Sequence, residues 1–153
     1  MLHKLIKDLE RLANKNKSLA YARFFKTEKG EYGEGDVFLG LTVPIQRKIA
    51  LEYTELELTD LRELLSSKIH EHRLVALLIL VEKYENSKEK QRIFDFYMKN
   101  ISCVNNWDLV DATSHKILGD YIASQEKSLI YKLAKSENLW ERRISIVSTL
   151  LYK

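Results

Sequence analysis

The stretch EHRLVALLIL at residues 71–80 has a partner in ERRISIVSTL at residues 141–150. The two share an acid at the first position, an arginine at the third, two apolar positions and a closing leucine. A ring side chain precedes each, His70 and Trp140, and Trp107 lies between them, 37 residues after the first and 33 before the second. Helix pairs that recur about every 35 to 40 residues are typical of an α-solenoid, although an ordinary helical bundle is also compatible with this pattern.

The rest of the chain supports an all-α fold, because apolar residues recur with helical spacing almost everywhere. The exception is TEKGEYGEGDVFLGLTV at 27–43, which holds four of the five glycines and predicts a small hairpin. Its GEGDVF lacks the third glycine and the lysine of a phosphate-binding loop. The predicted helices are 2–15, 17–26, 44–54, 59–67, 70–84, 87–100, 106–122, 125–135 and 137–153.

Length and composition limit the remaining choices. A chain of 153 residues with 45% hydrophobic content predicts a single domain, 1–153, with a sizeable core. The charged N-terminus does not resemble a signal peptide, and no apolar run is long enough to span a bilayer, so we expect no membrane association. One cysteine among 153 residues indicates a reducing compartment, most simply the cytoplasm. The net charge of +3 is only a weak indication of an anionic partner.

Three charged residues fall where helical periodicity expects apolar ones. Asp111 lies between Leu118 and Ile122 on the apolar side of its helix, Arg143 lies among the apolar residues of the last helix, and Arg73 is embedded in an almost wholly apolar helix. An ionised group is expensive to bury unless it is paired. Two interpretations follow: internal pairing, for example of Asp111 with an arginine of a neighbouring repeat, or a groove whose edge these side chains line.

Several motifs in order then carry a resemblance to a known family. FLGLTVPIQRKIA, NNWDLVD, GDY and SENLWERRI, with this spacing, resemble the AlkD family of HEAT-like-repeat DNA glycosylases, from about residue 20 to the end of the chain. The resemblance implies a curved α-solenoid whose basic concave face binds double-stranded DNA. It also implies hydrolysis of the N-glycosidic bond of cationic alkylated purines, such as 3-methyladenine and 7-methylguanine, without a cofactor or metal.

The resemblance assigns roles to five residues. It places the family's catalytic carboxylate on Asp111, an active-site tryptophan on Trp107 and a DNA-contacting arginine on Arg143. It makes Arg47 and Lys48, in PIQRK, candidate phosphate contacts. The chemistry agrees, because a fixed carboxylate stabilises the cationic sugar that forms as the base leaves.

The chain departs from the family pattern at its C-terminus. The family continues for further helices that supply a second active-site tryptophan, whereas this sequence stops at STLLYK and leaves an apolar stripe that includes Leu150 and Leu151. We therefore expect a fragment, a truncated form that uses a partner, or a chain that self-associates through the last helix. The alternative functions are a non-catalytic DNA-binding solenoid that recognises branched or damaged DNA, and a helical-repeat scaffold for proteins.

Four other candidates have simpler explanations. His115, one turn after Asp111, could pair with that carboxylate, but a histidine at the edge of the apolar stripe is the simpler reading. Cys103 lacks a readable catalytic His and Asp, and Tyr32 reads as a surface residue unless it sits at a hairpin tip near DNA. In HEH at 70–72 the two histidines point about 200° apart on a helix and cannot hold one metal ion.

Overall fold

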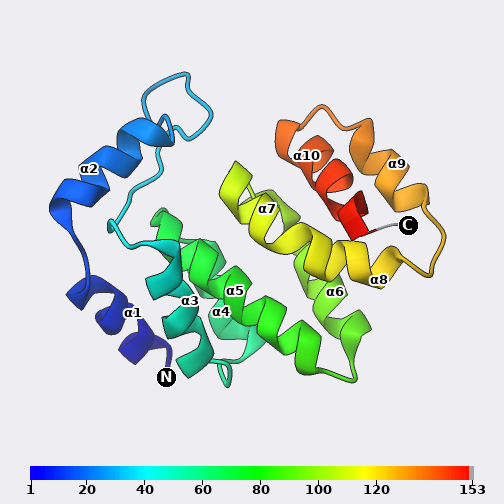
Figure 1. Cartoon of the computed structure of the whole chain (residues 1–153), viewed down its shortest axis with the longest axis horizontal. Coiled ribbons are helices and arrows are strands. Elements are labelled where there is room, and N and C mark those ends of the chain that lie inside the picture. Colours follow the sequence, from blue (N-terminus) through cyan, green and yellow to red (C-terminus); the bar gives the residue numbers. More distant parts are fainter. Residues whose placement is uncertain (152–153) are drawn as a thin grey trace. The chain divides into compact units, whose positions relative to one another are not determined.

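The computed structural model describes residues 1–151, and short helices account for most of that range (Figure 1). No strand occurs among these residues, so the predicted all-α class is confirmed, and the succession of helices is consistent with an α-solenoid of helical repeats. Within residues 1–151 every predicted helix is present, with ends shifted by a few residues, and residues 152–153 of the last predicted helix lie outside the described range. The α-helices are α1 (Leu2–Arg11), α2 (Lys15–Phe24), α3 (Val43–Glu52), α4 (Leu58–Leu65), α5 (His70–Asn86), α6 (Lys90–Lys99), α7 (Trp107–Ser114), α8 (Asp120–Ile122), α9 (Ser128–Ala134) and α10 (Leu139–Ser148).

The chain forms two compact units, Met1–Leu80 and Val81–Lys153. In the first unit the core gathers around α5, whose residues 74–80 are all buried. Leu5 and Leu9 of α1 and Leu61 and Leu64 of α4 are buried as well. A helix that is apolar nearly all round, as the sequence indicated for α5, is a helix in the centre of a core.

The glycine-rich segment does not form the predicted hairpin. Residues 28–35 form turns and bends, and the strand pairing of residues 27–42 with the rest of residues 1–151 is limited to one isolated parallel bridge between Val37 and Ile69. Gly40 explains part of this path, since its φ is +85° and a Cβ there would lie 2.3 Å from the Asn14 carbonyl oxygen. The hairpin prediction was wrong because the segment is held by hydrogen bonds to a side chain of α5 and not by pairing between two strands of its own.

A buried carboxylate anchors this loop. Glu71 is 0% exposed, and its two oxygens accept hydrogen bonds from the backbone N–H groups of Leu39 (2.9 Å), Gly40 (2.8 Å) and Leu41 (3.2 Å). These converging amide groups resemble a phosphate cradle, but their anion is a side chain of the same chain. The loop therefore has a structural partner for its amide groups.

The embedded Arg73 is also paired. Its Nη2 donates to Asp36 Oδ2 at 2.6 Å, and His70 Nδ1 lies 3.2 Å from the same oxygen. Burial by itself raises the pKa of Asp36, but the hydrogen bonds from His70 and Arg73 and the charge of Arg73 outweigh it and lower the pKa below its usual value. The expectation that this buried charge needs a partner is confirmed.

In the second unit, α7, a π-helical segment (His115–Gly119) and α8 follow one another without a break. Helix α10 packs against both α9 and α7 (Figure 1). Leu109 and Val110 of α7, Ile117 and Leu118 of the π-helical segment and Ile144 of α10 are buried. This packing brings α7 and α10 together, and these helices carry Asp111 and Arg143.

The last helix agrees in part with the predicted apolar stripe. Ile144 is buried, whereas Ile146 and Leu150 are 67% and 69% exposed. The side chain of Leu151 lies outside the described residues. Self-association through this helix stays a prediction.

The helices of residues 1–151 include none with the length and apolar character needed to cross a membrane.

Candidate functional site

The candidate site begins at the start of α7, where a buried asparagine caps the helix. Asn106 is fully buried, and its Oδ1 accepts a hydrogen bond from the Trp107 backbone N–H at 2.8 Å. Capping by an asparagine side chain fixes where the first turn begins. Trp107 is therefore the first residue of α7, half-buried, and Asp111 follows one turn later. Residues four apart lie on the same helix face, so the two side chains share an edge of α7.

Asp111 forms a bidentate ion pair with Arg143 of α10. Arg143 Nε donates to Asp111 Oδ1 at 2.8 Å, and Arg143 Nη2 donates to Asp111 Oδ2 at 2.7 Å. The side chains are 42% exposed for Arg143 and 37% exposed for Asp111. The internal pairing left open by the sequence is thus present, but it lies at the surface of the unit and not in its core.

The pair favours the charged form of Arg143. The hydrogen bond to Asp111 raises the pKa of Arg143, burial opposes this rise, and the charge of Asp111 adds to it. Two parallel charge-assisted hydrogen bonds give the pair a defined geometry. A planar guanidinium can form the same arrangement with phosphate oxygens. A half-exposed arginine held in this way is therefore open to a competing oxyanion.

The approach of α10 to the π-helical segment depends on two small residues, Gly119 and Ser148. Gly119 lies so close to α10 that a Cβ built on it would be 2.3 Å from the Ser148 carbonyl oxygen. Ser148 is fully buried, and its hydroxyl donates to the Ser114 carbonyl at 3.3 Å. This contact, which the sequence analysis missed, sets the separation of the helices that carry the ion pair. The glycine of GDY inside a predicted helix was the one available signal.

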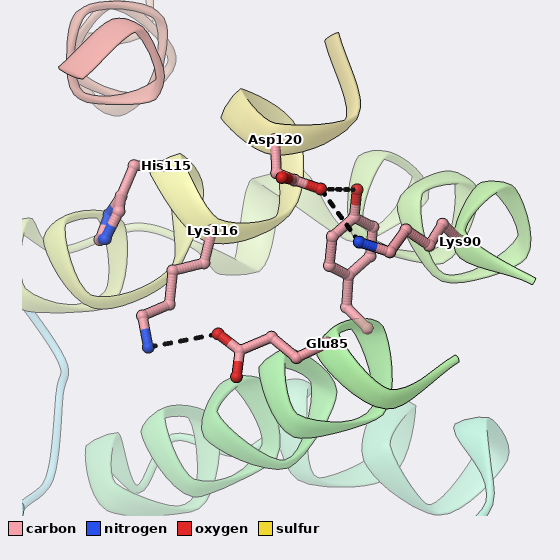
Figure 2. Close-up of a pocket in the computed structure, with 6 residues that line it drawn as sticks. Glu85, Lys90, His115, Lys116 and Asp120 are labelled. Carbon is pink, nitrogen blue, oxygen red and sulfur yellow. Dashed lines mark hydrogen bonds and ion pairs between the residues drawn. The ribbon is translucent and has the colours of Figure 1, made fainter. Parts of the chain in front are cut away.

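His115 does not take the carboxylate that the sequence analysis offered it. Both oxygens of Asp111 accept from Arg143, and His115 lines a pocket together with Lys116 and Asp120 (Figure 2). Burial lowers the pKa of His115, and the charge of Lys116 lowers it further, against smaller opposing effects from Asp111. The ring is therefore neutral at pH 7.

The other predicted contacts, Arg47 and Lys48, lie exposed on α3 in the first compact unit. The structure brings together Asp111 and Arg143, with Trp107 one turn away, whereas these two basic residues belong to a different unit. Their role as phosphate contacts stays a prediction.

The two histidines of HEH contact other side chains of the first unit. His70 lies against Asp36, and His72 Nδ1 lies 3.1 Å from the Ser67 hydroxyl. Among residues 1–151, no three His, Cys, Asp or Glu side chains gather closely enough to hold a metal ion. Cys103 is a half-buried free thiol, and Tyr32 is 39% exposed on the glycine-rich loop.

Sequence comparison identifies the family. The sequence model of a family described as "DNA alkylation repair enzyme" matches residues 5–153. The chain belongs to this family. A search of curated proteins finds no match. Membership of the DNA alkylation repair family gives the general function, repair of alkylated DNA by an enzyme, and with it DNA as the substrate.

Proposed function

We propose that this chain releases alkylated purine bases from double-stranded DNA by hydrolysing the N-glycosidic bond, with Asp111 as the catalytic carboxylate. The observation that carries the proposal is the half-exposed, bidentate pair of Asp111 with Arg143. Such a pair offers both groups that the reaction needs on one surface: a carboxylate for a cationic sugar and a guanidinium for a neighbouring phosphate.

The substrate supplies much of the driving force. A purine alkylated at N3 or N7 carries a positive charge, so when the bond from C1′ to the base nitrogen breaks, the electron pair moves to the base and leaves it neutral. No general acid is then required. The sugar becomes an oxocarbenium ion, which water attacks at C1′ while its proton passes to Asp111 or to solvent. A fixed carboxylate lowers the barrier by stabilising the positive charge as it develops.

Arg143 regulates the charge of Asp111 in this scheme. In the free protein the guanidinium neutralises the carboxylate at 2.7 and 2.8 Å. A DNA phosphate competes for the same donors, because it presents oxygens with a similar spacing. When Arg143 moves to the phosphate, the negative charge of Asp111 is left uncompensated beside the sugar. DNA binding thus prepares the carboxylate and positions the lesion at the same time.

Trp107 supports the same transition state. It precedes Asp111 by one helical turn and is half-buried. An aromatic face attracts a cation by about 0.5 to 2 kcal/mol, depending on how far water is excluded. We assign Trp107 to the sugar and the cationic base, both of which carry positive charge during the reaction.

The direct test is base release from a duplex that contains 7-methylguanine. At saturating protein, release should exceed the rate measured without protein, and it should depend on Asp111. Release at the uncatalysed rate would reject the glycosylase proposal for this chain.

The same ion pair supports a second candidate, binding of branched or damaged DNA without base excision. Here Asp111 and Arg143 stay paired in the complex and the pair has a structural role in joining α7 to α10. In that case Asp111→Asn would lower the stability of the protein and weaken DNA binding, whereas the glycosylase proposal predicts slower base release from a folded protein.

A further inference from the structure

A shallow pocket lies within the second unit, beside the helix that carries Asp111. It has a volume of about 400 Å³ and is formed by the end of α5, the start of α6, the π-helical segment and α8. Figure 2 shows the side chains around it. The lining residues are Tyr84, Glu85, Lys90, His115, Lys116 and Asp120.

Two lysines reach the pocket from different helices, and each is held by a carboxylate. Lys90 Nζ lies 3.2 Å from Asp120 Oδ2, and Lys116 Nζ lies 3.5 Å from Glu85 Oε1 (Figure 2). All four side chains are between 35% and 49% exposed. Pairs this exposed contribute little to stability. Both ammonium groups can therefore exchange a carboxylate for another oxyanion at small cost.

The carboxylate that Lys90 would leave keeps a second donor. The Tyr84 hydroxyl donates to Asp120 Oδ2 at 2.8 Å, and Lys90 Nζ lies 4.5 Å from the centre of the Tyr84 ring. Tyr84 thus holds Asp120 in place and keeps the ammonium of Lys90 close to the pocket by a cation–π contact.

His115 adds an imidazole to the lining of the pocket. Burial lowers the pKa of His115, the positive charge of Lys116 lowers it further, and Asp111 opposes both effects, so the ring is neutral at pH 7. A neutral imidazole can donate a hydrogen bond to an oxyanion without itself needing a counter-charge. Three donors, Lys90 of α6 and His115 and Lys116 of the π-helical segment, therefore line one pocket.

The position of the pocket identifies the anion. His115 and Lys116 follow Asp111 by four and five residues on a continuous helical run, a separation of about 6 to 8 Å at 1.5 Å per residue. One DNA strand presents a phosphate about every 3.4 Å of duplex axis. A strand whose nucleotide lies at Asp111 therefore has its next phosphates within reach of the pocket.

We propose that this pocket is a second DNA-backbone subsite, in which Lys90 and Lys116 leave Asp120 and Glu85 to bind a phosphate that flanks the nucleotide at Asp111. The proposal rests on the proposed function only in taking DNA as the ligand. It holds equally if the chain binds DNA without excising bases.

The test is the salt dependence of binding to an unmodified duplex, measured by fluorescence anisotropy between about 50 and 200 mM salt. The double variant Lys90→Gln/Lys116→Gln should bind about three- to tenfold more weakly, as expected for the loss of one solvent-exposed hydrogen bond. Its slope of log affinity against log salt should fall by about 0.9, as expected for one phosphate. The matched control is Lys132→Gln/Lys135→Gln, which removes two exposed lysines of the same unit outside the pocket. Equal losses in the two double variants would overturn the proposal.

A second variant, which should change the affinity for duplex in the opposite direction, gives an independent test. Glu85→Gln/Asp120→Asn frees both lysines, so it should bind duplex more tightly than the wild type, with an unchanged melting temperature as the check on folding. Weaker binding by this folded variant would contradict the exchange of partners.

Two further measurements, an NMR titration with inorganic phosphate and a base-release assay, identify the source of the phosphate and separate the two proposals. If millimolar inorganic phosphate shifts the NMR signals of His115 while the lysine double variant binds duplex like the wild type, the pocket binds free phosphate and the assignment to DNA is wrong. Base release is measured in parallel on the wild type. If the lysine double variant has a lower salt slope but the wild type releases no base, the subsite is supported and the glycosylase proposal is rejected. If the wild type releases base but the slope of the double variant is unchanged, the glycosylase proposal is supported and the subsite is rejected.

Discussion

Asp111→Asn should tighten DNA binding while it slows base release, two effects of opposite direction from one substitution. In the free protein Asp111 competes with DNA for Arg143, so removal of its charge frees the guanidinium. The pair has good bidentate geometry but is 42% and 37% exposed, which places its strength near the upper end for surface pairs, about 1 kcal/mol. At 1.4 kcal/mol per tenfold, this corresponds to an increase in affinity of up to about fivefold.

The chemical step should respond in the other direction. Without its carboxylate the site loses the group that faces the cationic sugar, and loss of one such electrostatic contact slows an enzyme by about a hundredfold or more. Affinity is measured by fluorescence anisotropy on an unmodified duplex, and base release on a duplex that contains 7-methylguanine. Asp95→Asn is the matched control, because it makes the same chemical change at an exposed position of α6 in the same unit.

A double-variant cycle isolates the competition. Arg143→Gln alone should weaken binding and lower the salt slope by about 0.9. In that background Asp111→Asn should change affinity no more than Asp95→Asn does, since there is no guanidinium left to free. If Asp111→Asn weakens binding in the wild-type background, or tightens it equally with and without Arg143, the competition between carboxylate and phosphate is refuted.

Three further predictions concern the packing that supports the site. Gly119→Ala should lower the free energy of unfolding by about 1 to 3 kcal/mol, because the new Cβ meets the Ser148 carbonyl oxygen and α10 must shift. Chemical denaturation measures this change, and an unchanged midpoint would mean that α10 can move away from Gly119 without loss of stability. Glu71→Gln should cost about 3 kcal/mol, since an amide cannot accept from all three N–H groups of residues 39–41, and a melting temperature equal to that of the wild type would contradict the anchoring role. Burial lowers the pKa of His72 below 6.5, so below that pH the unfolded chain takes up a proton that the folded protein does not. The free energy of unfolding should therefore fall as the solution is acidified from about pH 6.5 towards the pKa of His72 in the folded protein. His72→Gln should flatten this decline, and an equally steep decline in the variant would exclude His72 as its source.

Much of the candidate site was visible in the sequence because its parts are local. The asparagine before Trp107, the apolar periodicity after it and the acid one turn later can all be read within a few residues, and the structure places α7 at Trp107–Ser114 with that cap. The pocket beside His115 could not be read in this way, because it joins residues from α5, α6, the π-helical segment and α8.

The sequence by itself determined the helices, the almost wholly apolar character of α5 and the need of Arg73 and Asp111 for partners. These follow from helical periodicity and from the cost of burying charge, which depend on residues close together in the chain. Only the tertiary structure decided which partners they take: Asp36, 37 residues before Arg73, and Arg143, 32 residues after Asp111. The glycine-rich segment shows the same division, since its turns depend on the buried Glu71, 30 to 32 residues further along the chain. Periodicity specifies which face of a helix is covered, but the covering residue depends on how closely two helices approach, and for α10 a glycine without a side chain sets that distance.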